Sequence, residues 1–140
     1  MNTDSRVPLD EGDCKTLNAL GVELVVLFGS QAQNTATAGS DFDLGVFLSR
    51  ASFQEQKKGL YDALYDLFAA KINRLVDIDI VFLEQAPLEL LGHVLKHGVA
   101  LYERTPQSFA RFREAVMNRY ADFAPLLSVF QSAILARIAP

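Results

Sequence analysis

Apolar and polar residues follow two different spacings along the chain. Single alternation and short unbroken apolar runs are typical of β-strands. They predict four strands, over residues 22–28, 41–48, 76–83 and 99–102. Apolar positions three and four apart are typical of helices and predict them over residues 9–20, 52–70 and 87–98. Strands that alternate with helices predict an α/β (α+β) fold, with a small mixed sheet and flanking helices.

A long apolar stripe marks the C-terminal helical segment, about residues 106–138. Its members recur at intervals of three or four: Phe109, Phe112, Val116, Tyr120, Phe123, Leu127, Phe130, Ile134 and Ile138. The stripe could close the core of a single domain. It runs for about eight helical turns, however, which is more than a small sheet can cover, so we expect a protein interface. Pro125 predicts a break or kink near residues 123–125.

The length and composition predict one soluble domain, residues 1–140, that buries a core. Cys14 is the only cysteine, so no intramolecular disulfide is possible, and residues 1–5 lack the layout of a signal peptide. We therefore expect a cytoplasmic protein. No apolar run approaches the roughly 18 residues that span a membrane. The formal net charge of −4 opposes general binding to nucleic acid.

The strongest chemical pattern lies between the first two predicted strands. Gly29 and Ser30 follow the first strand, and Asp41 and Asp43 open the second. Alternate residues of a strand share a face, so the two carboxylates project together. Gly29 lets the backbone approach a phosphate, and Ser30 is expected at the N-terminus of a short helix, which favours an anion. Paired carboxylates suit Mg²⁺ with substrate phosphates, so the pattern predicts nucleotide chemistry.

A third carboxylate is expected on the third strand. Asp79 lies between two isoleucines, where a charge is unfavourable unless it faces a cleft with a counter-ion. With Asp41 and Asp43 it would complete a two-metal arrangement. Asp77 shares its face, either as the ligand or as a solvated residue at the start of the strand. In the simpler alternatives, the paired carboxylates lie at a solvated sheet edge and Ser30 only caps a helix.

Three further residues carry reactive side chains without a matching pattern. His93 and His97 have the spacing of a zinc pair on a helix, but the residues between them do not fit a metalloprotease and no further ligand is evident. We expect both to be solvated. Cys14 has no partner cysteine and lies between charged residues, so a structural thiol is expected.

The glycine turn and the aspartates also resemble a known family. Gly29-Ser30, ten intervening residues and Asp41-x-Asp43 resemble the signature of the polymerase β-type nucleotidyltransferase superfamily, in its minimal nucleotidyltransferase (MNT) branch. Residues 76–87 are similar to the segment that carries the third carboxylate of this branch, with Asp79 in its place. The resemblance covers about residues 20–103 and implies the polymerase β-type nucleotidyltransferase fold.

The resemblance implies a specific function. MNT proteins are usually antitoxins that transfer AMP from Mg·ATP to a tyrosine hydroxyl of a HEPN-domain ribonuclease toxin and form a complex with it. Carried over, Gly29 and Ser30 bind the phosphates, and Asp41, Asp43 and Asp79 are the catalytic and metal-binding residues, with Asp79 nearest the incoming hydroxyl. The expected partners are a cognate HEPN toxin and ATP. A hetero-oligomer or a homodimer would form through the C-terminal helices.

The turn after the glycine departs from the family pattern. Many relatives carry basic residues and a second glycine there, whereas this chain has Gln31, Gln33 and Asn34. Phe82 stands where relatives often have another acidic residue, and its alternation with Asp79 places it on the core face.

Two alternative functions remain: a non-catalytic antitoxin that covers its toxin with the C-terminal stripe, and a small-molecule nucleotidyltransferase such as those that modify aminoglycosides.

Overall fold

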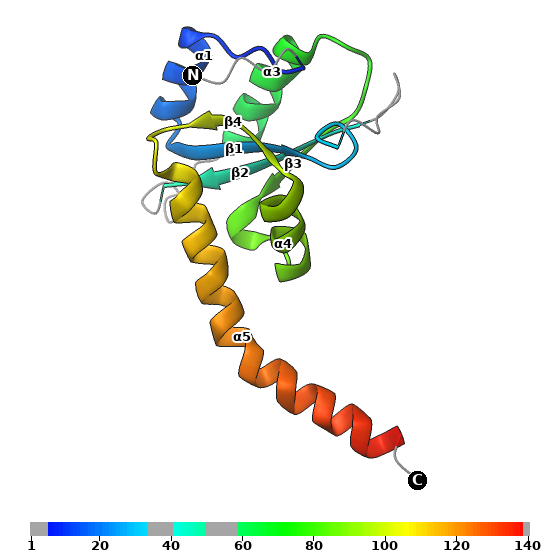
Figure 1. The fold of residues 1–140 in the computed structure, drawn as a ribbon. Coiled ribbons are helices and arrows are strands. Elements are labelled where there is room, and N and C mark those ends of the chain that lie inside the picture. The colour runs from blue at the N-terminus through cyan, green and yellow to red at the C-terminus, as the bar shows by residue number, and fades with distance from the viewer. Residues whose placement is uncertain (1–5, 34–40, 50–58, 139–140) are drawn as a thin grey trace.

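The computed structural model describes residues 6–33, 41–49 and 59–138 (Figure 1). Its elements in chain order are α1 (Glu11–Ala19), β1 (Val22–Phe28), β2 (Phe42–Leu48), α3 (Leu60–Ile72), β3 (Ile78–Phe82), the 3₁₀ helix η1 (Leu83–Gln85), α4 (Leu88–His97), β4 (Val99–Glu103) and α5 (Ser108–Ile138). All four predicted strands are confirmed. The start of the helix expected from residue 52 lies outside the described residues.

The four strands form one mixed sheet in the order β3-β2-β1-β4. β1 is antiparallel to both of its neighbours, whereas β2 and β3 run parallel. Every residue of β1 is buried, because this central strand is paired along both edges and covered on both faces. The mixed sheet expected from the sequence is therefore confirmed.

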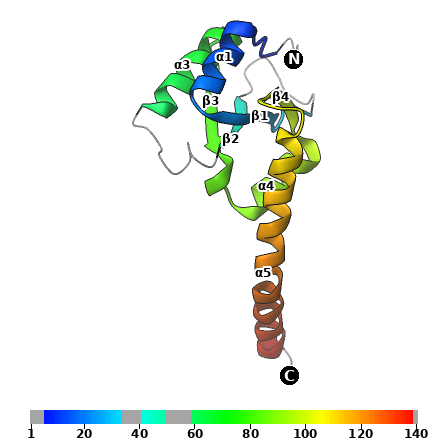
Figure 2. The ribbon, with the colours of Figure 1, turned by 90° about the vertical axis from the view of Figure 1, so that its left-hand side faces the viewer.

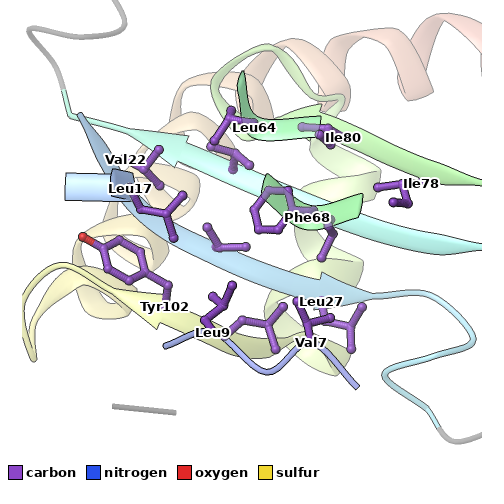
Figure 3. Close-up of a cluster of buried hydrophobic side chains, with 14 of the residues drawn as sticks. Val7, Leu9, Leu17, Val22, Leu27, Leu64, Phe68, Ile78, Ile80 and Tyr102 are labelled. Carbon is purple, nitrogen blue, oxygen red and sulfur yellow. The ribbon is translucent and has the colours of Figure 1, made fainter. Parts of the chain in front are cut away.

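Helices cover both faces of this sheet (Figures 1 and 2). α1 and α3 lie on one face, over a first hydrophobic cluster that includes Leu17, Leu27 and Phe68 (Figure 3). α4 and the first part of α5 lie on the other face, over a second cluster that includes Leu91 and Phe112. Side chains of the central strand β1 therefore enter both clusters.

The segment before α1 is fixed against the first of these faces. Val7 and Leu9 are 1% and 5% exposed, and Figure 3 shows both in the first cluster. Asp10 then begins α1 with a reciprocal cap: the Asp13 N–H donates to the Asp10 carboxylate at 2.8 Å, and the Asp10 N–H donates to the Asp13 carboxylate at 2.9 Å. Burial and capping together hold residues 6–9 in place.

α5 is anchored at its first turn and extends away from the rest of the domain (Figure 1). The buried Glu23 carboxylate accepts hydrogen bonds from the Ser108 hydroxyl and from Arg111 Nη1, both at 3.0 Å. The helix continues through Pro125, and Figure 1 shows it changing direction along its length. The sequence predicted a break or a kink near Pro125, and the break does not occur. None of the described helices is long and apolar enough to cross a membrane.

A half-buried glutamate links η1 to the end of β2. Both carboxylate oxygens of Glu84 face the Leu48 N–H, at 3.1 and 3.3 Å. Burial raises the pKa of Glu84 to about 7, although the hydrogen bond from Leu48 opposes this shift. The carboxyl group is therefore partly protonated near neutral pH.

The raised pKa of Glu84 predicts that the fold loses stability as the pH rises. The folded state keeps this proton where the unfolded state has lost it, so the loss occurs between pH values of about 4.5 and about 7. Raising the pH from about 5 to about 8 should lower the free energy of unfolding by about 2 kcal/mol through the Glu84 carboxyl group. Glu84→Gln should abolish that loss. Urea unfolding at the two pH values measures it. Glu89→Gln, at an exposed position of α4, is the control; an unchanged pH dependence in Glu84→Gln would contradict the prediction.

Candidate functional site

Two of the three predicted site aspartates face each other across neighbouring strands. The parallel register of β2 and β3 pairs Asp43 with Asp79, and pairs Phe42 with Ile78. Phe42 and Ile78 belong to the cluster beneath α1 and α3. The next residue of each strand, Asp43 or Asp79, therefore projects from the opposite face of the sheet. Both carboxylates lie near the N-terminal ends of their strands, at one end of the sheet.

The charges of the three aspartates act on one another. Asp43 is half-buried, whereas Asp41 and Asp79 are exposed. Burial raises the pKa of Asp43 above its usual value, and the charges of Asp79 and Asp41 raise it further. Asp43 and Asp79 are thus neighbours across the two strands, and the charge of Asp41 also reaches Asp43. Asp77, the alternative to Asp79, is exposed just before β3, and its C=O accepts the Phe42 N–H at 2.9 Å.

The glycine turn lies directly against the central carboxylate. Gly29 follows β1 with a φ of +74°, a conformation that L side chains rarely adopt. A Cβ added there would lie 2.3 Å from Asp43 Oδ2, so the close approach also requires glycine. Ser30 lies in the same turn, which the Gln33 N–H closes by donating to the Gly29 C=O at 3.3 Å. Residues 29–33 form a turn, and the residues after Gln33, where the short helix expected from Ser30 would continue, lie outside the described residues.

An arginine from the N-terminal segment also reaches this turn. Arg6 Nη1 donates a hydrogen bond to the C=O of Gln31, a residue that is itself 5% exposed. The neighbouring Ala32 packs against the first hydrophobic cluster. Sequence reasoning missed Arg6, because 25 residues separate it from Gln31 and no local pattern connects them.

The chemistry of the donor set fits a hard divalent cation. Carboxylate oxygens are the ligands that Mg²⁺ prefers, and a cation would relieve the repulsion among Asp41, Asp43 and Asp79. Over the described ranges, no three histidine, cysteine, aspartate or glutamate side chains are grouped closely enough to hold a metal ion. The magnesium site therefore stays a prediction.

The remaining candidates lie away from these aspartates. His93 and His97 are exposed on α4 with their ring centroids 4.9 Å apart, which agrees with solvated side chains. Phe82 packs against the first cluster, on the face opposite Asp79, as its alternation predicted. Cys14 is half-buried in α1, beside the same cluster.

Residues 15–107 match the family described as polymerase beta, nucleotidyltransferase. Because this match spans well over half of the chain, the protein belongs to that nucleotidyltransferase family. The four-stranded mixed sheet has the corresponding polymerase β-type fold. No curated protein matches the chain significantly.

Solved structures similar to this chain include toxin–antitoxin complexes. One is a crystal structure of a toxin–antitoxin with AMP-PNP, which is 26% identical with a TM-score of 0.58 over 89% of this chain and 94% of that chain. A second is a MntA–HpeT toxin–antitoxin with a tyrosine-to-alanine substitution, 26% identical with a TM-score of 0.56 over 94% of this chain and 99% of that chain. A third is a MntA–HpeT toxin–antitoxin with two aspartates changed to glutamate. It is 24% identical with a TM-score of 0.56 over 94% of this chain and 100% of that chain, and supports the fold alone.

Gly29→Ala tests whether the turn and the central carboxylate are in contact. The added Cβ should push the Asp43 carboxylate away from the turn, so the pKa of Asp43 should fall toward its usual value. Carboxyl ¹³C chemical shifts followed through a pH titration measure this change. Gly59→Ala is a matched control, because Gly59 also has a positive φ (+91°) but nothing lies within 4 Å of its added Cβ.

Each alanine should lower the free energy of unfolding by about 1 kcal/mol through backbone strain. Only the variant at Gly29 should change the titration of Asp43. Identical Asp43 titrations in the two variants would show that the turn does not constrain this carboxylate.

Proposed function

We propose that this protein is an antitoxin that silences its partner by transferring AMP from Mg·ATP to a tyrosine hydroxyl of a HEPN-domain toxin. The observation that carries the proposal is the pairing of Asp43 with Asp79 beside the Gly29 turn, with the charge of Asp41 acting on Asp43. Membership of the nucleotidyltransferase family supports the reaction type. The similarity to a toxin–antitoxin with AMP-PNP supports both the partner and the nucleotide.

Each site residue has a distinct role in this reaction. Gly29 and Ser30 would receive the triphosphate, because glycine lets the backbone approach a phosphate closely and the N–H groups of such a turn favour an anion. Asp41 and Asp43 would hold Mg²⁺, together with Asp79 on the adjacent strand. A bound divalent cation supplies positive charge that offsets the charge developing on the phosphates.

The proposed step is a nucleotidyl transfer with pyrophosphate as the leaving group. The tyrosine oxygen forms a bond to the α-phosphorus, and the bond from that phosphorus to the oxygen bridging to the β-phosphate breaks. The hydroxyl proton leaves as the new bond forms. Asp79 is the proposed acceptor of this proton, because its carboxylate is exposed and lies on β3, an edge strand of the sheet.

Intact-protein mass spectrometry of a HEPN-domain toxin, sought first in the neighbouring gene, tests the reaction. Incubation with this protein, Mg²⁺ and ATP should add the mass of one or more AMP groups to the toxin. Asp41→Asn, Asp43→Asn and Asp79→Asn should each slow the addition by about 100-fold or more, because each removes a charge from the proposed metal site. Asp77→Asn is the matched control and should keep activity, since Asp43 pairs with Asp79 across the strands.

A stable complex without AMP addition from any nucleoside triphosphate would exclude this chemistry and favour the non-catalytic antitoxin. AMP transfer to a small molecule but not to the toxin would favour the aminoglycoside-type alternative.

The proposed contact with the toxin lies on α5, and one observation favours it. Phe112 and Val116 are buried against the domain, but farther along the helix Met117 and Phe123 are 58% and 41% exposed. The Tyr120 side chain still contacts the domain, since its hydroxyl donates a hydrogen bond to the Leu88 C=O at 3.1 Å. The apolar stripe therefore continues beyond the surface that the domain covers, as an interface would require.

Phe123→Ser should weaken the complex with the toxin by about tenfold or more, because large apolar anchors dominate binding energy. Isothermal titration calorimetry with the purified toxin measures this change. Asn118→Ser, at an exposed polar position of the same helix, should leave the affinity unchanged. Equal affinities for both variants would exclude this part of α5 from the interface.

A further inference from the structure

The turn beside the aspartates has no charged residue of its own. The sequence from residue 29 to residue 40 is Gly-Ser-Gln-Ala-Gln-Asn-Thr-Ala-Thr-Ala-Gly-Ser. A triphosphate carries several negative charges, and the neighbouring carboxylates oppose its approach. The segment itself therefore supplies no positive charge to offset this repulsion.

Arg6 is in contact with this turn. Its Nη1 donates a hydrogen bond to the C=O of Gln31, two residues after Gly29. The guanidinium is half-buried and charged at every working pH. A hydrogen bond from a charged donor is stronger than one from a neutral donor, so this contact constrains the backbone of the turn.

The segment that carries Arg6 is itself fixed. Val7 is 1% exposed and Leu9 is 5% exposed in the first cluster, and the Leu9 N–H donates to the Val7 C=O at 2.9 Å. The backbone that carries the Arg6 side chain is therefore held by the hydrophobic core. On the other side of the contact, Gln31 is buried and Ala32 packs on the same cluster.

We propose that Arg6 is a positioning residue for nucleotide binding: it clamps the Gln31 carbonyl and so holds the Gly29–Gln33 turn in the conformation that receives the triphosphate. This inference rests on the proposed nucleotidyl transfer. It assigns to an N-terminal arginine, outside the Gly-Ser and aspartate motif, the task of shaping the phosphate-binding turn.

Steady-state kinetics of AMP transfer with Arg6→Gln and Arg6→Lys test this role. Arg6→Gln should raise the KM for ATP by about tenfold and change kcat by less than about threefold, because the clamp acts on binding and not on the reacting atoms. Arg6→Lys keeps the charge and a donor, and should recover most of the affinity. Lys96→Gln, at an exposed position of α4, makes the same change of net charge and should behave like the wild type.

Amide hydrogen exchange of the nucleotide-free protein gives a second readout. Arg6→Gln should speed exchange at the Gln33 N–H, which closes the turn, and leave exchange in β1 unchanged. A wild-type KM in Arg6→Gln, or a loss confined to kcat, would overturn the inference while leaving the proposed function intact. A wild-type protein that binds no triphosphate would instead overturn the proposed function, and the inference with it.

Discussion

Parallel pairing of β2 with β3 is the constraint on which the site depends. Asp43 lies opposite Asp79 because the neighbouring strands β2 and β3 run in the same direction. Parallel neighbours of this kind need a crossover connection. α3 lies in that connection and covers one face, so the aspartates project from the other. Because β1 is antiparallel to β2, its C-terminal end delivers Gly29 to the same end of the sheet.

This arrangement opposes stability. Burial raises the pKa of Asp43, and repulsion from the carboxylates of Asp79 and Asp41 raises it further. The hydrophobic clusters on both faces of β1 make the sheet stable enough to tolerate the strain. In the proposed reaction a divalent cation would relieve this repulsion, and that relief would contribute to its binding.

The sequence predicted the strands for a physical reason, because period-two alternation fixes which side chains of a strand share a face. It could therefore place Asp43 and Asp79 on the faces opposite Phe42 and Ile78 without the strand order, while their role as metal ligands stays a prediction. It could not predict contacts that depend on tertiary packing. The clamp from Arg6 to Gln31 joins residues that no periodicity relates, and Glu84 has an altered pKa only because η1 lies against the end of β2. Pro125 did not break α5, because the helix there is solvated and water can satisfy the carbonyl that loses its partner.

The molecule separates its two proposed tasks along β1. Glu23, at the start of this strand, holds the first turn of α5, whereas Gly29 follows the other end of the strand beside Asp43. A strand of this length spans about 20 Å, beyond the range over which substitutions usually couple. Chemistry at the aspartates and binding along α5 are therefore expected to respond independently to mutation. An antitoxin built this way could keep hold of its partner after the modification is complete, because the surface that binds is not the surface that reacts.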